Sequence, residues 1–384
     1  MKKKRVIVAM SGGVDSSVAA ALLKKQGYEV IGIFMKLWAD KVANTDLVKE
    51  NICCSVEAAT AARAVAHKLE IPFYVVNLEK EFKKAVVDYY VKEYEEGRTP
   101  NPCVICNRDI KGEVLMRKAL EMEADFLATG HYARIREVKS QYSKAKLTEY
   151  KLLTAVDENK DQTYFLWTLT QKHLAKLLFP VGEYTKPDVR KMAAKMHLPT
   201  AERKESQGIC FIPDRDVCAF LHRYAKKLTK PGPIMDKTGK RLGIHSGLIN
   251  YTIGQRERLN IGGPRAYYVL KLNKRNNSLI VGNDGDLYKT KLIAESLNWI
   301  TPKNKDQFKI SKIGGRIRYG HTVAECKLDC SHRNRVKVTF DVPQRAITPG
   351  QSIVFYLPRP VSRITEGAKS RGDGKEVLGG GIIN

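Results

Sequence analysis

The sequence predicts an α/β protein with a doubly wound parallel sheet in its first half, followed by a small central domain and a C-terminal β-barrel domain. In the first half, short β-branched runs alternate with helix-like segments, which is typical of parallel strands covered by helices on both faces. From Pro231 onward, short β-like runs are separated by Gly, Asn and Pro, which favours small β-domains or barrels. We expect boundaries near residues 213 and 286, so the predicted domains cover 1–213, 214–285 and 286–384.

The elements of the first half follow from the spacing of its apolar residues. The predicted strands are residues 5–10, 29–35, 73–78 and 125–130, and the predicted helices are 17–26, 57–69, 81–95 and 113–122. Gly27 is expected to end the first helix, because glycine adopts the usual C-terminal cap conformation at little cost. Residues 132–156 are expected to form a hairpin with a polar tip. Ligands should bind beyond the carboxyl ends of the parallel strands, where Ser11 and Gly130 both fall.

The loop between the first strand and the first helix is the most informative motif. Its sequence is Ser11-Gly12-Gly13-Val14-Asp15-Ser16-Ser17. Two glycines allow a tight turn, and the backbone N–H groups at the start of a helix attract anions. The loop contains no lysine and does not match the G-x-x-x-x-G-K-[ST] phosphate loop, so amides and hydroxyls would have to hold the phosphate. We expect Asp15 to help hold a magnesium ion or to orient the loop.

The chain is strongly basic. Lys and Arg number 67 against 41 Asp and Glu, which gives a formal net charge of +26. A polyanionic partner would explain this excess, whereas a ligase acting on small metabolites has no need of it. No apolar stretch approaches the ~20 residues of a membrane span, so we expect no membrane partner. The start of the chain runs directly into the first strand, and we expect a cytoplasmic protein without a targeting segment.

Three of the eight cysteines lie in segments that indicate chemistry. Cys103 and Cys106 form a C-x-x-C pair in a Pro-rich loop, and Cys210 lies in a second loop-like segment. In a cytosolic chain, such a pair indicates redox work or metal ligation more often than a structural disulfide. Nearby Arg98 and Arg108 would lower the pKa of a thiol and favour the thiolate. We expect the remaining cysteines to serve packing; they are Cys53, Cys54, Cys218, Cys326 and Cys330.

The motifs resemble those of a known group of enzymes. The Ser11 loop resembles that of the pyrophosphate-loop ATPases, which have an adenine-nucleotide α-hydrolase-like fold, cleave ATP between its α- and β-phosphates, and adenylate a substrate. Over nearly its whole length, the chain is similar to the tRNA-specific 2-thiouridylases, bacterial enzymes that convert the wobble uridine of certain tRNAs to 2-thiouridine. The motifs that carry the resemblance are residues 10–17, 99–107, 129–134, 160–166, 208–212, 251–256, 318–319, 349–351 and 378–382.

The resemblance implies a reaction that depends on ATP and Mg²⁺. The implied nucleotide contacts are Ala9, Met10, Ser11, Gly12, Gly13, Val14, Asp15, Ser16, Met35 and Gly130. Adenylation of the C2 oxygen of a flipped-out uridine would make AMP the leaving group. Cys210 would deliver sulfur from a persulfide, and Cys106 would attack that persulfide and close the cycle as a Cys106–Cys210 disulfide. The implied catalytic residues are therefore Asp15, Cys106 and Cys210.

The resemblance also implies two macromolecular partners. The first is the anticodon arm of tRNA, with implied contacts from Asn101, Pro102, Cys103, His131, Lys160, Asp161, Gln162, Arg318, Tyr319 and Gln351. Much of the remaining affinity would come from Lys and Arg contacts to phosphates and would depend on salt. The second partner is the sulfur donor, either a sulfur-relay protein or a cysteine desulfurase.

The chain departs from the family pattern at Cys103, where many members have aspartate. Three thiolates, from Cys103, Cys106 and Cys210, could instead hold a 4Fe–4S cluster whose open iron binds sulfide, so two sulfur-transfer mechanisms stay open. Residues 358–375 resemble an insertion between two C-terminal strands. Two other functions also stay open. A small-molecule ligase of the same ATPase group would need neither Cys106 nor Cys210, and a non-catalytic RNA-binding protein would not need Asp15.

Overall fold

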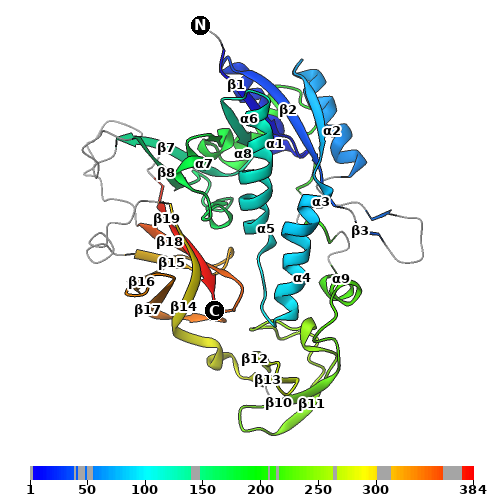
Figure 1. Ribbon diagram of the computed structural model, residues 1–384, viewed down its shortest axis with the longest axis vertical. Coiled ribbons are helices and arrows are strands. Elements are labelled where there is room, and N and C mark those ends of the chain that lie inside the picture. Colours follow the sequence, from blue (N-terminus) through cyan, green and yellow to red (C-terminus); the bar gives the residue numbers. More distant parts are fainter. Residues whose placement is uncertain are drawn as a thin grey trace.

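A five-stranded parallel sheet forms the centre of the first half of the chain, in the order β5-β2-β1-β6-β9 (Figure 1). The computed structural model describes residues 3–38, 40–41, 48–49, 55–139, 148–205, 208–212, 216–262, 266–300, 313–357 and 374–384. The strands of this sheet are β1 (Arg5–Ala9), β2 (Glu29–Lys36), β5 (Phe73–Asn77), β6 (Phe126–Thr129) and β9 (Leu177–Leu178). The predicted parallel sheet is confirmed, and the two-residue strand β9, too short to show a pattern in the sequence, is added at its edge.

Both faces of this sheet are buried by helices. Val6 and Val8 of β1 pack with residues of α1 (Val14–Lys25), α2 (Val56–Lys68) and α8 (Lys186–Lys195). Ile7 and Ala9 point to the opposite face and pack with residues of α6 (Met116–Glu121). Because successive side chains of a strand alternate between faces, burial of both faces explains the continuous apolar run of β1. In place of the helix predicted over 81–95, the chain forms α3 (Glu79–Phe82), η1 (Lys83–Val87) and α4 (Asp88–Glu95).

A long helical segment carries the C-x-x-C pair. It consists of α5 (Pro102–Ile105), η2 (Cys106–Leu115) and α6 in succession, so the helix predicted over 113–122 begins much earlier. Asn101 Oδ1 accepts a hydrogen bond from the backbone N–H of Cys103 at 3.1 Å and caps this start. Proline is well tolerated in a first helical turn, where its missing N–H is not needed. The prediction of a loop presenting both cysteines was therefore wrong. The η2 stretch has the wide turns of a π-helix, which are frequent at functional sites.

The C-terminal part of the chain forms the predicted β-barrel. Its strands are hydrogen-bonded in the order β14-β17-β16-β15-β18-β19, and β19 pairs back with β14 to close the barrel. Their bounds are β14 (Tyr288–Trp299), β15 (Ile313–Arg316), β16 (Ala324–Asp329), β17 (Arg335–Arg345), β18 (Ser352–Leu357) and β19 (Glu376–Ile383). Cys326 is buried in the barrel core, and Cys330 packs against it, as expected.

The predicted hairpin joins the two halves of the molecule. Its strands β7 (Ala133–Lys139) and β8 (Thr148–Thr154) are antiparallel, and its expected tip lies outside the described residues. The second strand pairs with β19, so the hairpin extends the barrel rather than the parallel sheet. The chain therefore passes from the parallel sheet to the barrel and back within the first half of the sequence.

The central domain lies at the foot of the molecule in Figure 1. Its four strands are β10 (Gly232–Met235), β11 (Arg241–His245), β12 (Tyr268–Asn273) and β13 (Ser278–Gly282), in the order β11-β10-β13-β12. The shorter elements elsewhere in the chain are β3 (Asp40–Lys41), β4 (Val48–Lys49), η3 (Thr163–Phe165), α7 (Gln171–Leu174), η4 (Pro180–Glu183), α9 (Val217–Tyr224), η5 (Leu248–Asn250) and η6 (Asp284–Leu287). The exact domain boundaries stay predictions. Cys53, Cys54 and residues 358–373 of the expected insertion lie outside the described residues.

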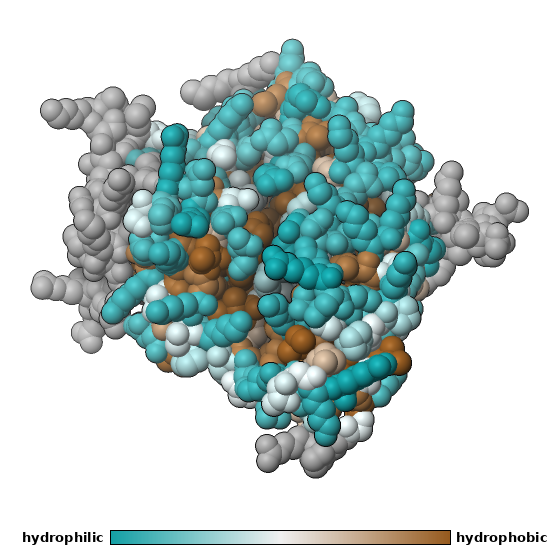
Figure 2. Space-filling model, turned by 60° about the horizontal axis from the view of Figure 1, so that its bottom comes forward, coloured by the Kyte–Doolittle hydropathy of each residue, from teal (hydrophilic) through white to brown (hydrophobic). Residues whose placement is uncertain are grey.

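Buried hydrogen bonds join the barrel to the parallel-sheet domain. The Trp167 indole N–H donates to Ser352 Oγ at 3.0 Å, and Tyr164 Oη donates to the Ser352 carbonyl at 2.9 Å. Figure 2 shows a largely hydrophilic face with hydrophobic residues gathered around a hollow near its middle. Among the helices of the described residues, none is both long enough and apolar enough to cross a membrane.

Candidate active site

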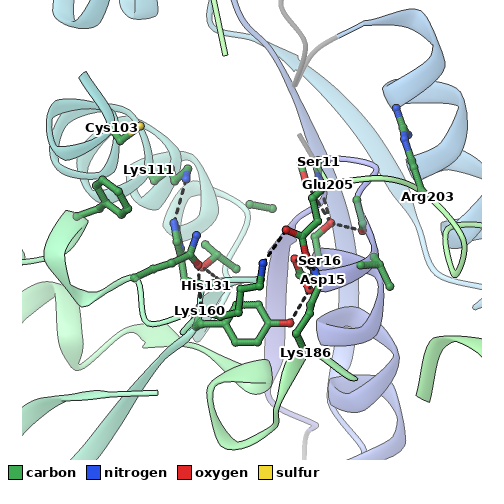
Figure 3. Close-up of a pocket in the computed structure, with 18 of the residues that line it drawn as sticks. Ser11, Asp15, Ser16, Cys103, Lys111, His131, Lys160, Lys186, Arg203 and Glu205 are labelled. Carbon is green, nitrogen blue, oxygen red and sulfur yellow. Dashed lines mark hydrogen bonds and ion pairs between the residues drawn. The ribbon is translucent and has the colours of Figure 1, made fainter. Parts of the chain in front are cut away.

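Two adjoining cavities lie at the carboxyl ends of β1, β2 and β6. The larger has a volume of about 690 Å³ and lies over the Ser11 loop (Figure 3). The smaller has a volume of about 290 Å³ and is lined by Cys103, Cys106 and Cys210. The residues common to both linings are Ser11, Met35, Cys103, Lys111, His131, Gln162, Phe165 and Gly208. A molecule bound in the larger cavity would therefore lie next to the cysteines.

Close backbone packing sets the shape of the Ser11 loop. Gly12 has a φ of +72°, and a Cβ built on it would lie 2.2 Å from the carbonyl oxygen of Ala58. A Cβ on Gly130 would lie 2.6 Å from the backbone nitrogen of Ser16. The N-cap of α1 is Gly13, which has no side chain to cap the first N–H groups. These N–H groups and the positive end of the helix dipole favour an anion at this point. The loop thus has the form expected of a phosphate-binding loop.

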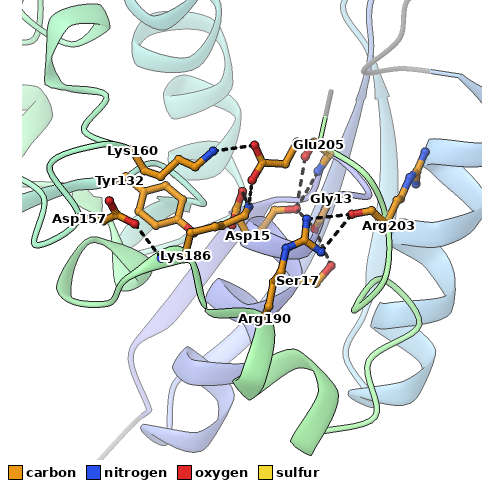
Figure 4. Close-up of polar contacts among 12 residues, drawn as sticks. Gly13, Asp15, Ser17, Tyr132, Asp157, Lys160, Lys186, Arg190, Arg203 and Glu205 are labelled. Atoms are coloured by element: carbon orange, nitrogen blue, oxygen red, sulfur yellow. Dashed lines mark hydrogen bonds and ion pairs between the residues drawn. The ribbon is translucent and has the colours of Figure 1, made fainter. Parts of the chain in front are cut away.

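Asp15 is held by two residues from distant parts of the chain (Figure 4). Lys186 Nζ lies 2.7 Å from Oδ1 and 2.8 Å from Oδ2 of Asp15. Tyr132 Oη donates to Oδ1 at 2.7 Å, and burial, with Asp15 beside it, raises the pKa of Tyr132. This geometry favours the second role expected of Asp15, which is to orient the loop.

A second carboxylate lies across the same cavity. Glu205 Oε1 lies 2.9 Å from Lys186 Nζ, and Glu205 Oε2 accepts a hydrogen bond from Lys160 Nζ at 2.8 Å. The hydrogen bond from Lys160, followed by that from Lys186, lowers the pKa of Glu205 to about 2, against the opposing effect of burial. Arg203 donates from Nη1 to the Gly12 carbonyl oxygen at 2.9 Å, so the segment that carries Glu205 is fastened to the Ser11 loop.

His131 lies where the two cavities meet. Its Nε2 lies 3.2 Å from Lys111 Nζ, and its Nδ1 lies 2.6 Å from Thr129 Oγ1. Burial, and then the positive charge of Lys111, lower the pKa of His131 well below its usual 6.5. The ring is therefore neutral at pH 7, and the lysine amine donates to Nε2 while Nδ1–H donates to the threonine oxygen.

The three cysteines differ in exposure. Cys103 is exposed and lines both cavities, whereas Cys106 and Cys210 are part-buried and line the smaller one. Cys106 is the first residue of η2, and Cys210 lies in a turn, as expected from the sequence. Within the described ranges, the structure contains no group of three or more His, Cys, Asp or Glu side chains that could hold a metal ion.

The residues expected to contact tRNA occupy several kinds of position. His131, Lys160, Gln162, Cys103 and Tyr319 line the larger cavity, and Asn101 and Pro102 lie at the start of α5. Gln351 Nε2 donates to the Thr99 carbonyl at 2.8 Å, and Arg318 Nη2 donates to Thr348 Oγ1 at 2.9 Å. These bonds attach the barrel to the loop before α5 and order Arg318 within the barrel.

The side chain of Asp161 is turned into the protein. It is only 4 % exposed, and its oxygens accept hydrogen bonds from Thr163 Oγ1 at 2.7 Å and from the Ala155 N–H at 3.2 Å. Arg316 Nη1 lies 3.4 Å from its Oδ2. In this structure the carboxylate therefore fixes the loop that carries Lys160 and Gln162, and the expected contact of Asp161 with tRNA stays a prediction.

Three family models match successive parts of the chain. The first, described as a tRNA methyl transferase HUP domain, matches residues 4–214. The second, a tRNA methyl transferase PRC-barrel domain, matches residues 218–283, and the third, an aminomethyltransferase beta-barrel domain, matches residues 289–383. The tRNA-specific 2-thiouridylase MnmA of Geotalea uraniireducens is 45% identical over 383 residues, which cover 100% of this chain and 95% of that protein. The chain belongs to the tRNA-specific 2-thiouridylase family.

A second curated relative agrees with this membership. The thiouridylase of Acetivibrio thermocellus is 43% identical over 383 residues, with 100% of both chains covered. The resemblance to this family that the sequence motifs indicate is thereby confirmed. Among solved structures, a 4-thiouridine synthetase–RNA complex with bound ATP is 15% identical, with 57% of this chain and 50% of that chain covered and a TM-score of 0.33. An NMN synthetase from Francisella tularensis is 14% identical, with 53% and 66% covered and a TM-score of 0.31.

Sequence reasoning did not single out several residues of this thiouridylase-family site. Lys186, Glu205, Tyr132 and Lys111 all line the larger cavity and make its main polar contacts. The only signal that could have indicated Lys186 is the need of the loop carboxylate Asp15 for a cation. Nothing in the spacing of the sequence shows which of the 67 Lys and Arg residues supplies it.

Proposed function

We propose that this protein catalyses ATP-dependent 2-thiolation of the wobble uridine of tRNA, the reaction of a tRNA-uridine 2-sulfurtransferase. One observation carries the proposal: the cavity over the Ser11 loop adjoins the cavity lined by Cys106 and Cys210. A base activated in the first cavity would therefore meet a sulfur carrier in the second. Membership of a family whose curated members are named tRNA-specific 2-thiouridylases supports tRNA as the substrate.

In the first half-reaction, the uridine C2 oxygen attacks the α-phosphorus of ATP and pyrophosphate leaves. The Ser11 loop binds the phosphates through its amides, and Met35 and Gly130 line the same cavity, where the adenosine would lie. Mg²⁺ would enter with the phosphates of the substrate, because both carboxylates nearest the loop, Asp15 and Glu205, are held by lysine. Because His131 is neutral, its ring adds no positive charge to that of the lysines and Mg²⁺ near the phosphates.

In the second half-reaction, the outer sulfur of a Cys210 persulfide attacks C2 and AMP leaves, which joins C2 to Cys210 through two sulfur atoms. The Cys106 thiolate then attacks the Cys210 sulfur, so the C2–sulfur bond stays and the product is 2-thiouridine. The two cysteines are oxidised to a disulfide, and a cellular dithiol reduces it. The persulfide would come from a sulfur-relay protein or a cysteine desulfurase. Because the cycle requires reduced thiols, we expect it to operate in the cytoplasm.

The tRNA would approach from the side on which the cavities open. The net charge of +26 favours a polyanion, and Lys160, Gln162 and Tyr319 lie on the cavity wall that an inserted base would reach. Phe165 and Tyr319 pack against each other with ring centroids 4.5 Å apart and their planes tilted by 35°. Aromatic side chains commonly accept unstacked bases on their faces.

The iron–sulfur alternative has weaker support. Cys103, Cys106 and Cys210 line one cavity, but the described residues include no three-ligand group that fits a metal ion. We therefore derive no step through a cluster. The persulfide mechanism requires only Cys106 and Cys210, and the cluster mechanism requires Cys103 as well.

The decisive experiment is anaerobic purification with iron and sulfide quantified, followed by a thiolation assay. The assay combines unmodified tRNA, ATP, Mg²⁺ and a sulfur source, and detects 2-thiouridine by mass spectrometry. Thiolation by metal-free protein that persists in Cys103→Ser and disappears in Cys210→Ser would support the persulfide mechanism. Activity that requires bound iron and disappears in Cys103→Ser would replace it with the cluster mechanism.

Two further variants test the other functions that the sequence leaves open. A small-molecule ligase would retain full activity in Cys210→Ser, since it uses no sulfur carrier. A non-catalytic RNA-binding protein would support normal tRNA function in cells after Asp15→Ala. Either result would contradict the proposed sulfurtransferase.

A further inference from the structure

The larger cavity contains a charge arrangement that the proposed reaction does not explain by itself. Lys160 and Lys186 face Asp15 and Glu205, so two positive side chains are balanced by two negative ones. Of the two lysines, Lys186 is only 7 % exposed and is bonded to both Asp15 and Glu205. Figure 4 shows Glu205 reaching between the two lysine ammonium groups.

This arrangement is unfavourable for a nucleotide as it stands. A triphosphate carries several negative charges and gains little from a cluster that is already neutral. The loop itself contains no lysine, so cations for the β- and γ-phosphates must come from elsewhere in the fold. Lys160 and Lys186 line the same cavity as Ser11, Gly13 and Ser16. They are therefore positioned to face an anion bound at the start of α1.

We propose that Lys160 and Lys186 bind the phosphates of the nucleotide, and that Glu205 occupies these lysines until a phosphate displaces it. This inference rests on the proposed function only in taking ATP as the nucleotide. The carboxylate of Glu205 stands in for a phosphate oxygen between the two ammonium groups. Lys186 keeps its two contacts with Asp15 throughout, so only the Glu205 side has to be exchanged.

The position of Glu205 fits a replaceable partner better than a permanent one. Asp15 lies in the first turn of α1, whereas Glu205 lies outside any helix or strand. Among the described residues, the Glu205 carboxylate is held by the two lysines, while Asp15 is also bonded to Tyr132. Release of Glu205 therefore breaks two contacts, and a phosphate restores both.

The test measures nucleotide binding to the full-length protein by isothermal titration calorimetry, without tRNA. Glu205→Gln is expected to bind ATP about threefold to tenfold more tightly than the wild type, because the competing charge is removed. Lys186→Gln and Lys160→Gln are each expected to bind ATP at least about tenfold more weakly. Adenosine, which has no phosphate, should bind all four proteins equally. The affinities for inorganic pyrophosphate should rank the four proteins in the same order as the affinities for ATP.

Glu202→Gln is the matched control, since it removes the same charge from an exposed position three residues earlier in the same segment. Its affinity for ATP should equal that of the wild type. Tighter binding by Glu205→Gln cannot arise from misfolding, which keeps the test valid even if Lys186→Gln is unstable. Unchanged or weaker ATP binding by Glu205→Gln would overturn the inference, as would loss of tRNA binding alone in Lys160→Gln. A wild-type protein that binds no ATP would instead contradict the proposed function.

Discussion

Lys186 and Asp15 form an ion pair in which one ammonium group contacts both carboxylate oxygens, at 2.7 and 2.8 Å, although the residues are 171 positions apart. The pair joins the start of α8 to the first turn of α1. Its position beside the Ser11 loop means that the loop geometry depends on a residue from a distant helix. The stability of this fold and the proposed binding of nucleotide are therefore connected at one point.

Removing the charge of Asp15 should affect both properties. Within the described part of the chain, Asp15→Asn leaves the buried Lys186 with Glu205 as its carboxylate partner, and we expect the free energy of unfolding to fall by about 1–3 kcal/mol. Displacement of the loop should lower the rate of adenylation on the order of 100-fold. Chemical denaturation and release of pyrophosphate measure the two effects. A double-mutant cycle with Lys186→Met is the control, and additive effects on stability would contradict the importance of the pair.

An added methyl group at Gly130 should weaken nucleotide binding. Its Cβ would lie 2.6 Å from the Ser16 backbone nitrogen and 2.8 Å from the Asp15 carbonyl carbon, so the Ser11 loop has to move. We expect Gly130→Ala to raise the KM for ATP about tenfold or more while the KM for tRNA changes little. Gly285→Ala is the matched control, because a Cβ there meets nothing within 4 Å. Equal KM values for ATP in the two variants would refute the proposed close packing.

Stability should decrease in acid because His131 is held neutral. Its pKa in the folded protein is below the 6.5 of the unfolded chain, so the unfolded state binds more protons as the pH falls. The contribution of His131 to the free energy of unfolding is fully present above pH 6.5. It is lost as the pH falls toward the pKa of His131 in the folded protein, at no more than about 1.4 kcal/mol per pH unit.

Denaturation of the wild type and of His131→Gln at several pH values measures this effect. Burial also lowers the pKa of His245 and His321, so the wild type should lose stability in acid for several reasons. The difference between the two proteins isolates His131, and the variant should show the shallower dependence. The exposed His332, changed to Gln, is the control. Identical pH profiles for wild type and His131→Gln would argue against a buried neutral imidazole.

The bond between Trp167 and Ser352 should stabilise the attachment of the barrel. Ser352→Ala leaves a buried indole N–H without its acceptor, and we expect a loss of about 1–3 kcal/mol in the free energy of unfolding. In a Trp167→Phe background, which has no indole N–H, the same substitution should cost much less. Thermal denaturation of the four proteins tests this, and an equal cost in both backgrounds would show that the hydrogen bond is unimportant.

Much of the fold follows from local sequence patterns. The run Val6-Ile7-Val8 predicts a strand buried on both faces, because every side chain along it is apolar, and Gly27 correctly indicates the end of α1. The start of α5 was harder to predict, since Pro102 suits both a loop and a first helical turn. The capping bond from Asn101 decides between them, and it is a contact between two residues that the pattern of apolar positions does not reveal.

The sequence by itself determined the proposed phosphate loop, the cysteines proposed to carry the chemistry, and the order of domain types, because each depends on local residue patterns along the chain. Only the tertiary structure decided which cation holds Asp15, that Asp161 is buried, and that Glu205 lies between two lysines. These facts depend on contacts between α1, α8 and the loops at the ends of the strands. Such contacts are set by the packing of whole elements, and pairs far apart in sequence leave no periodic trace along the chain.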